Sequence, residues 1–217
     1  MSSQDTRVDG GVTLRRESIW YVAGAPAHPV ERRGHFVAAV WSAFMHSGRL
    51  SAFERVGLPL LRAMRGVQAA RMAVVRLSAS TFDAGETRRL IEQAASIDAM
   101  VMVELAGLWS TPALEVLGAI RPAFVRVRHE YTAGAGVLPE QARRLLQLSD
   151  CMARTSTPLV AQGPLDGEDE VAARAAGIDL RVVTESGAGD SPWPADESLG
   201  VPGAPVVLDF PLRPTGR

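Results

Sequence analysis

The side chains best suited to bind a ligand in this sequence stand near the ends of short apolar runs. Arg76 and Glu104 close two such runs, and Arg126 and Arg128 alternate along a third. Alternate residues of a strand share one face, so Arg126 and Arg128 would point the same way. Guanidinium groups bind phosphate through paired hydrogen bonds, which indicates a nucleotide or phosphorylated ligand. The simpler interpretation, which we favour, is an ion-pair cluster in which Glu104 and solvent satisfy these arginines.

The other reactive side chains predict no catalytic or metal site and no cofactor. The four histidines are widely spaced, and only His129 adjoins a carboxylate, Glu130. Cys151 is the single cysteine and falls on an apolar helical face, as expected of an inert buried thiol. The chain has no lysine, which excludes a Schiff base and a P-loop lysine. The run TAGAGVLP has Pro139 where a nucleotide loop needs its third glycine, so we expect a flexible connection there.

Composition favours a single cytoplasmic domain. The chain has 217 residues, of which 47% are hydrophobic and 22% charged, enough for one core. A net charge of -1 and a pI near 6.4 provide no positive field for nucleic acid. The N-terminus lacks the apolar core of a signal peptide, and no apolar stretch reaches the roughly 20 residues that span a bilayer. We therefore expect neither nucleic-acid binding nor membrane insertion.

The spacing of apolar residues predicts the elements that must position these side chains. We expect a strand at 18–23 and helices at 35–48 and 51–65, followed by alternating strands and helices as in repeated βα units. The predicted strands are 73–77, 99–105, 123–127, 159–161 and 178–183. The predicted helices between them are 85–96, 111–120, 138–154 and 167–176.

Four segments of this chain resemble motifs of the EAL-type cyclic di-GMP phosphodiesterase domain. MAVVRLSASTF is similar to the strand that carries the family's Asn-Val-Ser motif, and MVMVEL to its Glu-Leu-Thr-Glu strand. RPAFVRVRHEY is similar to the Lys-Ile-Asp strand. TPLVAQGPLDGEDEVAARAAGIDL resembles the Ala-Glu-Gly-Val-Glu strand with the helix and strand that follow it. The resemblance implies an α/β, TIM-barrel-like fold that is truncated or incomplete here, because one internal unit and much of the opening segment lack counterparts.

The same resemblance implies that the catalytic centre has been lost. In the family, bound metal ions activate the water that attacks a phosphodiester. Arg76 stands at the Asn position, Arg126 at the Lys position, Arg128 at the neighbouring Asp position, and Gln162 at the first Glu of Ala-Glu-Gly-Val-Glu. The family's paired aspartates have no counterpart, or else align with Glu104 and Leu105, which leaves one carboxylate. We therefore expect an inactive domain.

The chain divides into four predicted parts. Residues 1–16 are expected to be disordered, 17–184 to form the EAL-like domain and 185–203 to form a flexible linker, because few apolar residues lie there. Residues 204–217 include a C-terminal apolar segment that we expect to return to its own domain; the alternative is docking on another protein.

Three functional hypotheses follow. The first is a protein-interaction or regulatory module in bacterial signalling, with an unidentified protein partner or a homodimer. Trp41, Phe44 and Met45 on the predicted helix 35–48 are the candidate interface. The second is a receptor for cyclic di-GMP or another anionic nucleotide that uses Arg76 and Arg126. The third is a metal-independent enzyme with Glu104 as a general base.

Overall fold

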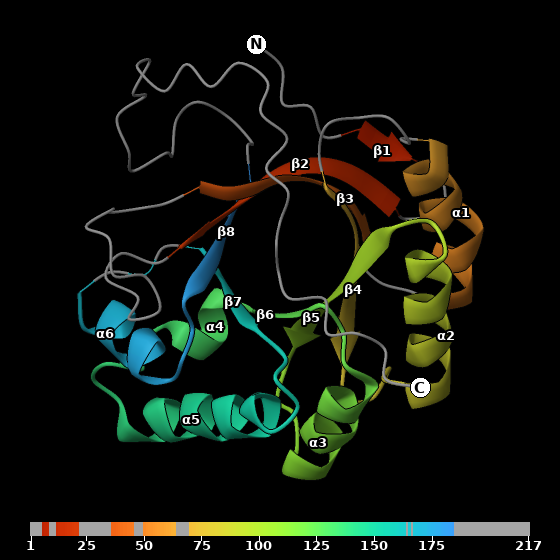
Figure 1. Ribbon diagram of the computed structural model, residues 1–217. Coiled ribbons are helices and arrows are strands. Elements are labelled where there is room, and N and C mark those ends of the chain that lie inside the picture. Colours follow the sequence, from red (N-terminus) through yellow and green to blue (C-terminus); the bar gives the residue numbers. More distant parts are fainter. Residues whose placement is uncertain are drawn as a thin grey trace, which may run out of the picture.

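The computed structural model describes residues 6–8, 12–21, 36–45, 50–63, 70–163, 165 and 167–184. These residues form one eight-stranded sheet with helices around it (Figure 1). The strands are β1 (Thr6–Val8), β2 (Val12–Tyr21), β3 (Phe36–Met45), β4 (Ala70–Ser78), β5 (Ala99–Ala106), β6 (Phe124–Val127), β7 (Leu159–Gln162) and β8 (Leu180–Thr184). The helices are α1 (Leu50–Ala63), α2 (Ala84–Ala95), α3 (Thr111–Ile120), α4 (His129–Thr132), α5 (Pro139–Ala153) and α6 (Gly167–Ala175).

The sheet curls into a closed ring. Strands β3 to β8 are parallel, and each pairs with the next along the chain. Strand β2 runs antiparallel to β3 on one side and to β8 on the other, so it joins the first and last parallel strands. Strand β1 adds a short antiparallel pairing to the start of β2. The fold is therefore the TIM-barrel-like α/β architecture expected from the sequence, with six parallel strands in place of the eight of a full TIM barrel.

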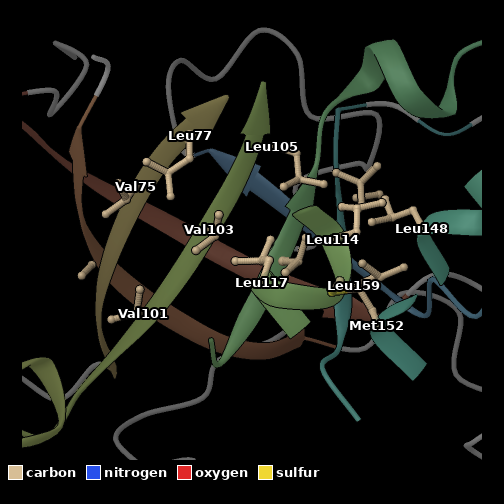
Figure 2. Packing of buried hydrophobic residues seen from close by; sticks show 14 of the residues in the cluster. Val75, Leu77, Val101, Val103, Leu105, Leu114, Leu117, Leu148, Met152 and Leu159 are labelled. Carbon is tan, nitrogen blue, oxygen red and sulfur yellow. The ribbon is translucent and has the colours of Figure 1, made fainter. Parts of the chain in front are cut away.

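Each face of the sheet carries its own hydrophobic layer. On the outer face the helices cover apolar side chains of neighbouring strands. Val75 of β4, Val103 of β5 and Leu117 of α3, all labelled in Figure 2, belong to this outer cluster. The inner face is filled by eight buried residues, namely Ile19, Met72, Val74, Met102, Phe124, Val160, Leu180 and Val182. Strands that are buried on both faces have nearly continuous apolar sequences, as these do.

Local signals in the sequence account for several helix ends. Asp83 is the N-cap of α2, and its side chain accepts a hydrogen bond from the amide of Glu86 at 2.8 Å. Helices α3 and α5 both have proline in their first turn, where its missing N–H has no cost. The strands and helices predicted between residues 73 and 183 agree with β4 to β8 and with α2, α3, α5 and α6 to within a few residues. The single-turn helix α4 was not predicted.

The predicted helix at 35–48 is wrong, because residues 36–45 form strand β3. The segment FVAAVWSAFM has apolar residues at helical spacing, but it is apolar at almost every position. Such a run is also typical of a strand buried on both faces. Ser42 is hydrogen-bonded on the inner side, whereas Ala43 and Met45 belong to the outer core. Burial on both faces therefore produced a pattern that periodicity alone could not distinguish from a helix.

The expectation of disorder over residues 1–16 also requires correction. Strand β1 and the first part of β2 lie in this segment, and β2 continues to Tyr21. The polar residues of β2 are compatible with a strand because it pairs with β3 along nearly its whole length. The predicted linker and C-terminal apolar segment, 185–217, lie outside the described residues.

Candidate functional site

Three charged residues predicted to form a site lie side by side across the inner face of the sheet. Arg76 of β4 is in register with Glu104 of β5, and Glu104 is in register with Arg126 of β6. Residues that share a register on adjacent strands point to the same side, so the three side chains meet inside the barrel. They lie one layer beyond the inner apolar cluster, toward the carboxyl ends of the parallel strands.

Glu104 is the centre of this arrangement and is fully buried. Its Oε1 accepts a hydrogen bond from Nε of Arg76 at 2.5 Å, and its Oε2 accepts one from Nη1 of Arg126 at 3.4 Å. Nε of Arg128 lies 3.9 Å from Oε1. A single carboxylate therefore faces three guanidinium groups. These contacts agree with the ion-pair cluster that we favoured from the sequence.

Arg126 connects Glu104 to a second buried carboxylate, Glu17 of β2. Nη2 and Nη1 of Arg126 donate to the two carboxylate oxygens of Glu17 at 2.6 and 3.2 Å. Glu17 also accepts a hydrogen bond from the hydroxyl of Ser42 at 2.8 Å, and Nε of Arg126 donates to Sδ of Met102 at 3.2 Å. The arginine side chain is 0% exposed. Arg126 thus satisfies its nitrogen atoms within the protein, which leaves it unsuited to bind an external anion.

Sequence reasoning missed Glu17. Its contact with Arg126 joins residues 109 positions apart and depends on the pairing of β2 with β8, which no local pattern encodes. The one available signal was a carboxylate next to the predicted strand at 18–23. We define the ion-pair cluster as Glu17, Arg76, Glu104, Arg126 and Arg128.

The remaining predicted site residues lie at the open end of the barrel. The side chains of Arg76 and Arg128 are 28% and 34% exposed, so both reach solvent. Gln162 ends β7, and its Oε1 is buried without a hydrogen-bond partner among the described residues. Gln162, the last residue of β7, and Arg128, the first residue after β6, lie at the same end of the parallel sheet. This end of the sheet therefore carries two partly exposed guanidinium groups and an amide whose oxygen is buried.

The donor set does not fit a divalent metal ion. Calcium, magnesium and manganese sites are built from several carboxylate or carbonyl oxygens. Within the described part of the chain, no three His, Cys, Asp or Glu side chains come together. The two carboxylates of the cluster are bridged by Arg126, and further guanidinium groups beside Glu104 repel a cation. The ions that the fold family implies therefore find no suitable ligands in this cluster.

The candidate interface residues do not form the exposed helical surface that we expected. Met45 is 1% exposed and lies in the outer core. Trp41 and Phe44 both belong to β3, but their side chains are not among those that the structure describes. Met45 is therefore a structural residue.

The glycine-containing run after α4 is an ordered turn rather than the flexible loop that we predicted. The amides of Gly134 and Gly136 donate to the two carboxylate oxygens of Asp169 in α6, each at 2.9 Å. These two hydrogen bonds lower the pKa of Asp169. The turn therefore uses its amides to hold a carboxylate of its own chain.

Cys151 is buried, as predicted for an inert thiol, and His129 is exposed in the short helix α4. In the described residues, no helix is both long and apolar enough to cross a bilayer.

The chain is similar in fold to solved structures of EAL domains. The S helix-GGDEF-EAL segment of Vibrio cholerae LapD, bound to c-di-GMP, has a TM-score of 0.52 and 14% identity, over 65% of this chain and 35% of that one. A standalone EAL protein from Vibrio cholerae O395, in its c-di-GMP-bound form, has a TM-score of 0.51 and 11% identity, over 81% and 91%. The PaMucR phosphodiesterase in complex with c-di-GMP has a TM-score of 0.50 and 10% identity, over 79% and 89%.

These likenesses establish the EAL-type fold. This chain spans about a third of the LapD segment and nine-tenths of the standalone EAL protein. No protein-family model and no curated protein sequence matches the chain.

Proposed function

We propose that this chain, which has the EAL-type fold, is a catalytically inactive domain that acts as a regulatory or protein-interaction module in bacterial cytoplasmic signalling. The observation that carries the proposal is the environment of Glu104. It is a fully buried carboxylate, and it is shared among Arg76, Arg126 and Arg128. A metal-assisted phosphodiesterase needs carboxylates that are free to hold cations.

The same environment argues against the metal-independent enzyme. A general base must reach the proton that it removes, within hydrogen-bond distance of the substrate. The side chain of Glu104 is 0% exposed, and both of its oxygens already accept hydrogen bonds from arginine. Glu17 is likewise buried and bonded to Arg126. Neither carboxylate is placed for proton transfer to a ligand.

A hydrolysis assay tests the proposal. The purified protein is incubated with cyclic di-GMP and either Mg²⁺ or Mn²⁺, and the products are separated by chromatography. We expect no product above the protein-free control with either ion. Turnover that disappears in the Glu104→Gln variant would overturn the proposal, since it would show that Glu104 takes part in catalysis.

A receptor for cyclic di-GMP or another anionic nucleotide is the second candidate. It is favoured by the partial exposure of Arg76 and Arg128 at the carboxyl ends of their strands. Parallel α/β folds bind ligands at this end of the sheet. Several neighbours of the same fold carry c-di-GMP in their structures. Arg126 is no longer part of this hypothesis, because its guanidinium is buried against Glu17.

Calorimetric titration with cyclic di-GMP separates the two candidates. The matched variants are Arg76→Ala, at the open end of the barrel, and Arg88→Ala, on the exposed surface of α2. Binding that Arg76→Ala weakens and Arg88→Ala leaves unchanged would establish the receptor. If the wild type gave no heat of binding, the first candidate would remain, a regulatory module that acts through a protein partner or a second copy of the chain.

A further inference from the structure

A pocket of about 510 Å³ opens beside the ion-pair cluster, between the turn that follows β5 and the helices α4 and α5. Its volume lies within the range of small-molecule sites. Arg128 is the residue that it shares with the cluster. The other side chains that define its chemistry are Leu108, Glu130, Tyr131, Gln141 and Arg144.

Two guanidinium groups of the pocket are incompletely engaged by the protein. Arg128 has Nη1 3.7 Å from Glu130 and Nε 3.9 Å from Glu104, both longer than a hydrogen bond. Arg144 donates from Nη2 to Glu140 at 2.5 Å, and its side chain is 40% exposed. Such a pair of arginines can bind the oxygens of a phosphate or carboxylate. Glu130 is the one carboxylate in the lining, so the arginines outnumber it.

Two other residues of the lining are apolar or aromatic. Leu108 lines the pocket and is 68% exposed. Tyr131 is 8% exposed, and its hydroxyl donates to the carbonyl of Gly107, so the ring is held in place as a wall. Burial, and then the nearby Glu130, raise the pKa of Tyr131 to about 12. The phenol therefore stays uncharged at neutral pH and adds no negative charge to the pocket.

We propose that this pocket binds a small organic anion, a phosphate or carboxylate attached to a planar apolar body. Arg128 and Arg144 hold the anionic group, and Leu108 and the ring of Tyr131 contact the body. The proposal goes beyond the regulatory function, and it does not depend on the absence of hydrolysis. It would give a regulatory domain a site for a small-molecule signal outside the barrel interior.

Phenyl phosphate is a suitable probe. Its binding is monitored through the amide chemical shifts of the ¹⁵N-labelled protein. We expect saturable shifts at Gly107 and Leu108, and weaker binding as salt is raised, because the contact is between exposed charges. Benzoate tests a carboxylate in place of the phosphate. Inorganic phosphate tests the anion without the ring, and benzyl alcohol tests the ring without the anion. Both should bind at least about tenfold more weakly than phenyl phosphate, which corresponds to about 1.4 kcal/mol.

Three arginine variants locate the binding. Arg128→Ala and Arg144→Ala should each raise the dissociation constant about tenfold or more, because each removes a charged hydrogen-bond donor. Arg154→Ala is the matched control: Arg154 follows the same helix α5 but pairs with Glu115 on α3, outside the pocket. It should leave the constant unchanged. If Arg128→Ala disturbs the fold because Glu104 loses a neighbouring guanidinium group, the effect of Arg144→Ala on the dissociation constant tests the proposal by itself.

The proposal fails if neither phenyl phosphate nor benzoate produces saturable shifts at the pocket. Equal weakening by Arg154→Ala would also contradict it, since this would reveal attraction to surface charge in general. If benzyl alcohol bound as tightly as phenyl phosphate, the anionic group would not contribute to recognition. If inorganic phosphate bound as tightly as phenyl phosphate, the organic body would not contribute to recognition.

Discussion

Arg126 occupies the interior of the barrel, where an unpaired charge could not be tolerated. Its three nitrogens donate to Glu17, Glu104 and Met102. A buried ion pair is weak evidence of net stabilisation, but removal of one partner is strongly destabilising. The stability of this network is therefore best tested by deleting its centre.

We predict that Arg126→Met lowers the free energy of unfolding by about 3–5 kcal/mol, because two buried carboxylates lose their shared partner. Urea unfolding followed by circular dichroism measures the change. Arg128→Ala is the control; its side chain is 34% exposed, so its loss should cost below about 1 kcal/mol. Adding Glu17→Gln to Arg126→Met should restore part of the stability. An unchanged midpoint for Arg126→Met would show that the network does not support the fold.

Tyr131 provides a second prediction at this scale. Its pKa in the folded protein, about 12, lies above the value of about 10 for a free tyrosine. The folded state therefore holds the proton more tightly than the unfolded state. The stabilising contribution is complete below about pH 10 and is lost as the pH rises through 12.

Phenolate absorbance measured against pH should show a titration near 12 that is missing from Tyr131→Phe. The same variant also loses the hydrogen bond to Gly107, at a cost of about 1 kcal/mol at neutral pH. A titration at the ordinary value would contradict the buried position of the ring.

Arg76, Glu104 and Arg126, which were grouped from the sequence, are neighbours in the structure, because adjacent βα units place equivalent strand positions side by side. It could not show that Arg126 is sealed from solvent. That property depends on Glu17, which reaches the arginine only when β2 closes the sheet. A pattern of local spacing carries no information on such a distant pairing.

Among the elements, the turn between α4 and α5 is attached to helix α6 through one side chain. Asp169 accepts the amides of Gly134 and Gly136. A β-carbon on Gly136 would lie 2.3 Å from the backbone of Glu168, so the turn and the helix approach closely there. Glycine at this position is therefore required by close packing.

Asp169→Asn should destabilise the protein by about 0.5–1 kcal/mol at pH 7, a cost comparable to the loss of a helix cap. The pKa of Asp169 is lowered in the folded protein, chiefly by the Gly136 and Gly134 amides. Its contribution is thus present above the unfolded value of about 3.9 and is lost as the pH falls through the lower folded value. Urea unfolding of both proteins should give a difference that shrinks on acidification; a constant difference would rule out the role of the charge.

Strand β3 shows the limit of periodicity at the level of elements. The βα units from 73 to 183 were predicted because Gly, Pro and charged residues separate their apolar runs. In β3 nearly every residue is apolar, so helical and extended patterns both fit. Its parallel pairing with β4 and antiparallel pairing with β2 decide the outcome.

On the scale of the whole molecule, the barrel-like fold could be predicted from the sequence, whereas its closure could not. The βα repeats required a parallel sheet with helices outside it, as Figure 1 shows. Closure by β2 places an antiparallel strand between β3 and β8 and completes a smaller ring. The ring brings together buried charges from β2, β5 and β6, and the exposed arginines remain at the carboxyl end of the parallel strands.

This charge distribution leads to the central claim, that the interior cannot hold the divalent ions of a phosphodiesterase. A titration of the protein with Mn²⁺, with free ion measured by electron paramagnetic resonance, tests the claim most directly. We predict that the free Mn²⁺ signal follows the protein-free standard up to equimolar ion, because Glu104 and Glu17 are held by arginine. Binding of one or two equivalents that is abolished by Glu104→Gln would contradict the account.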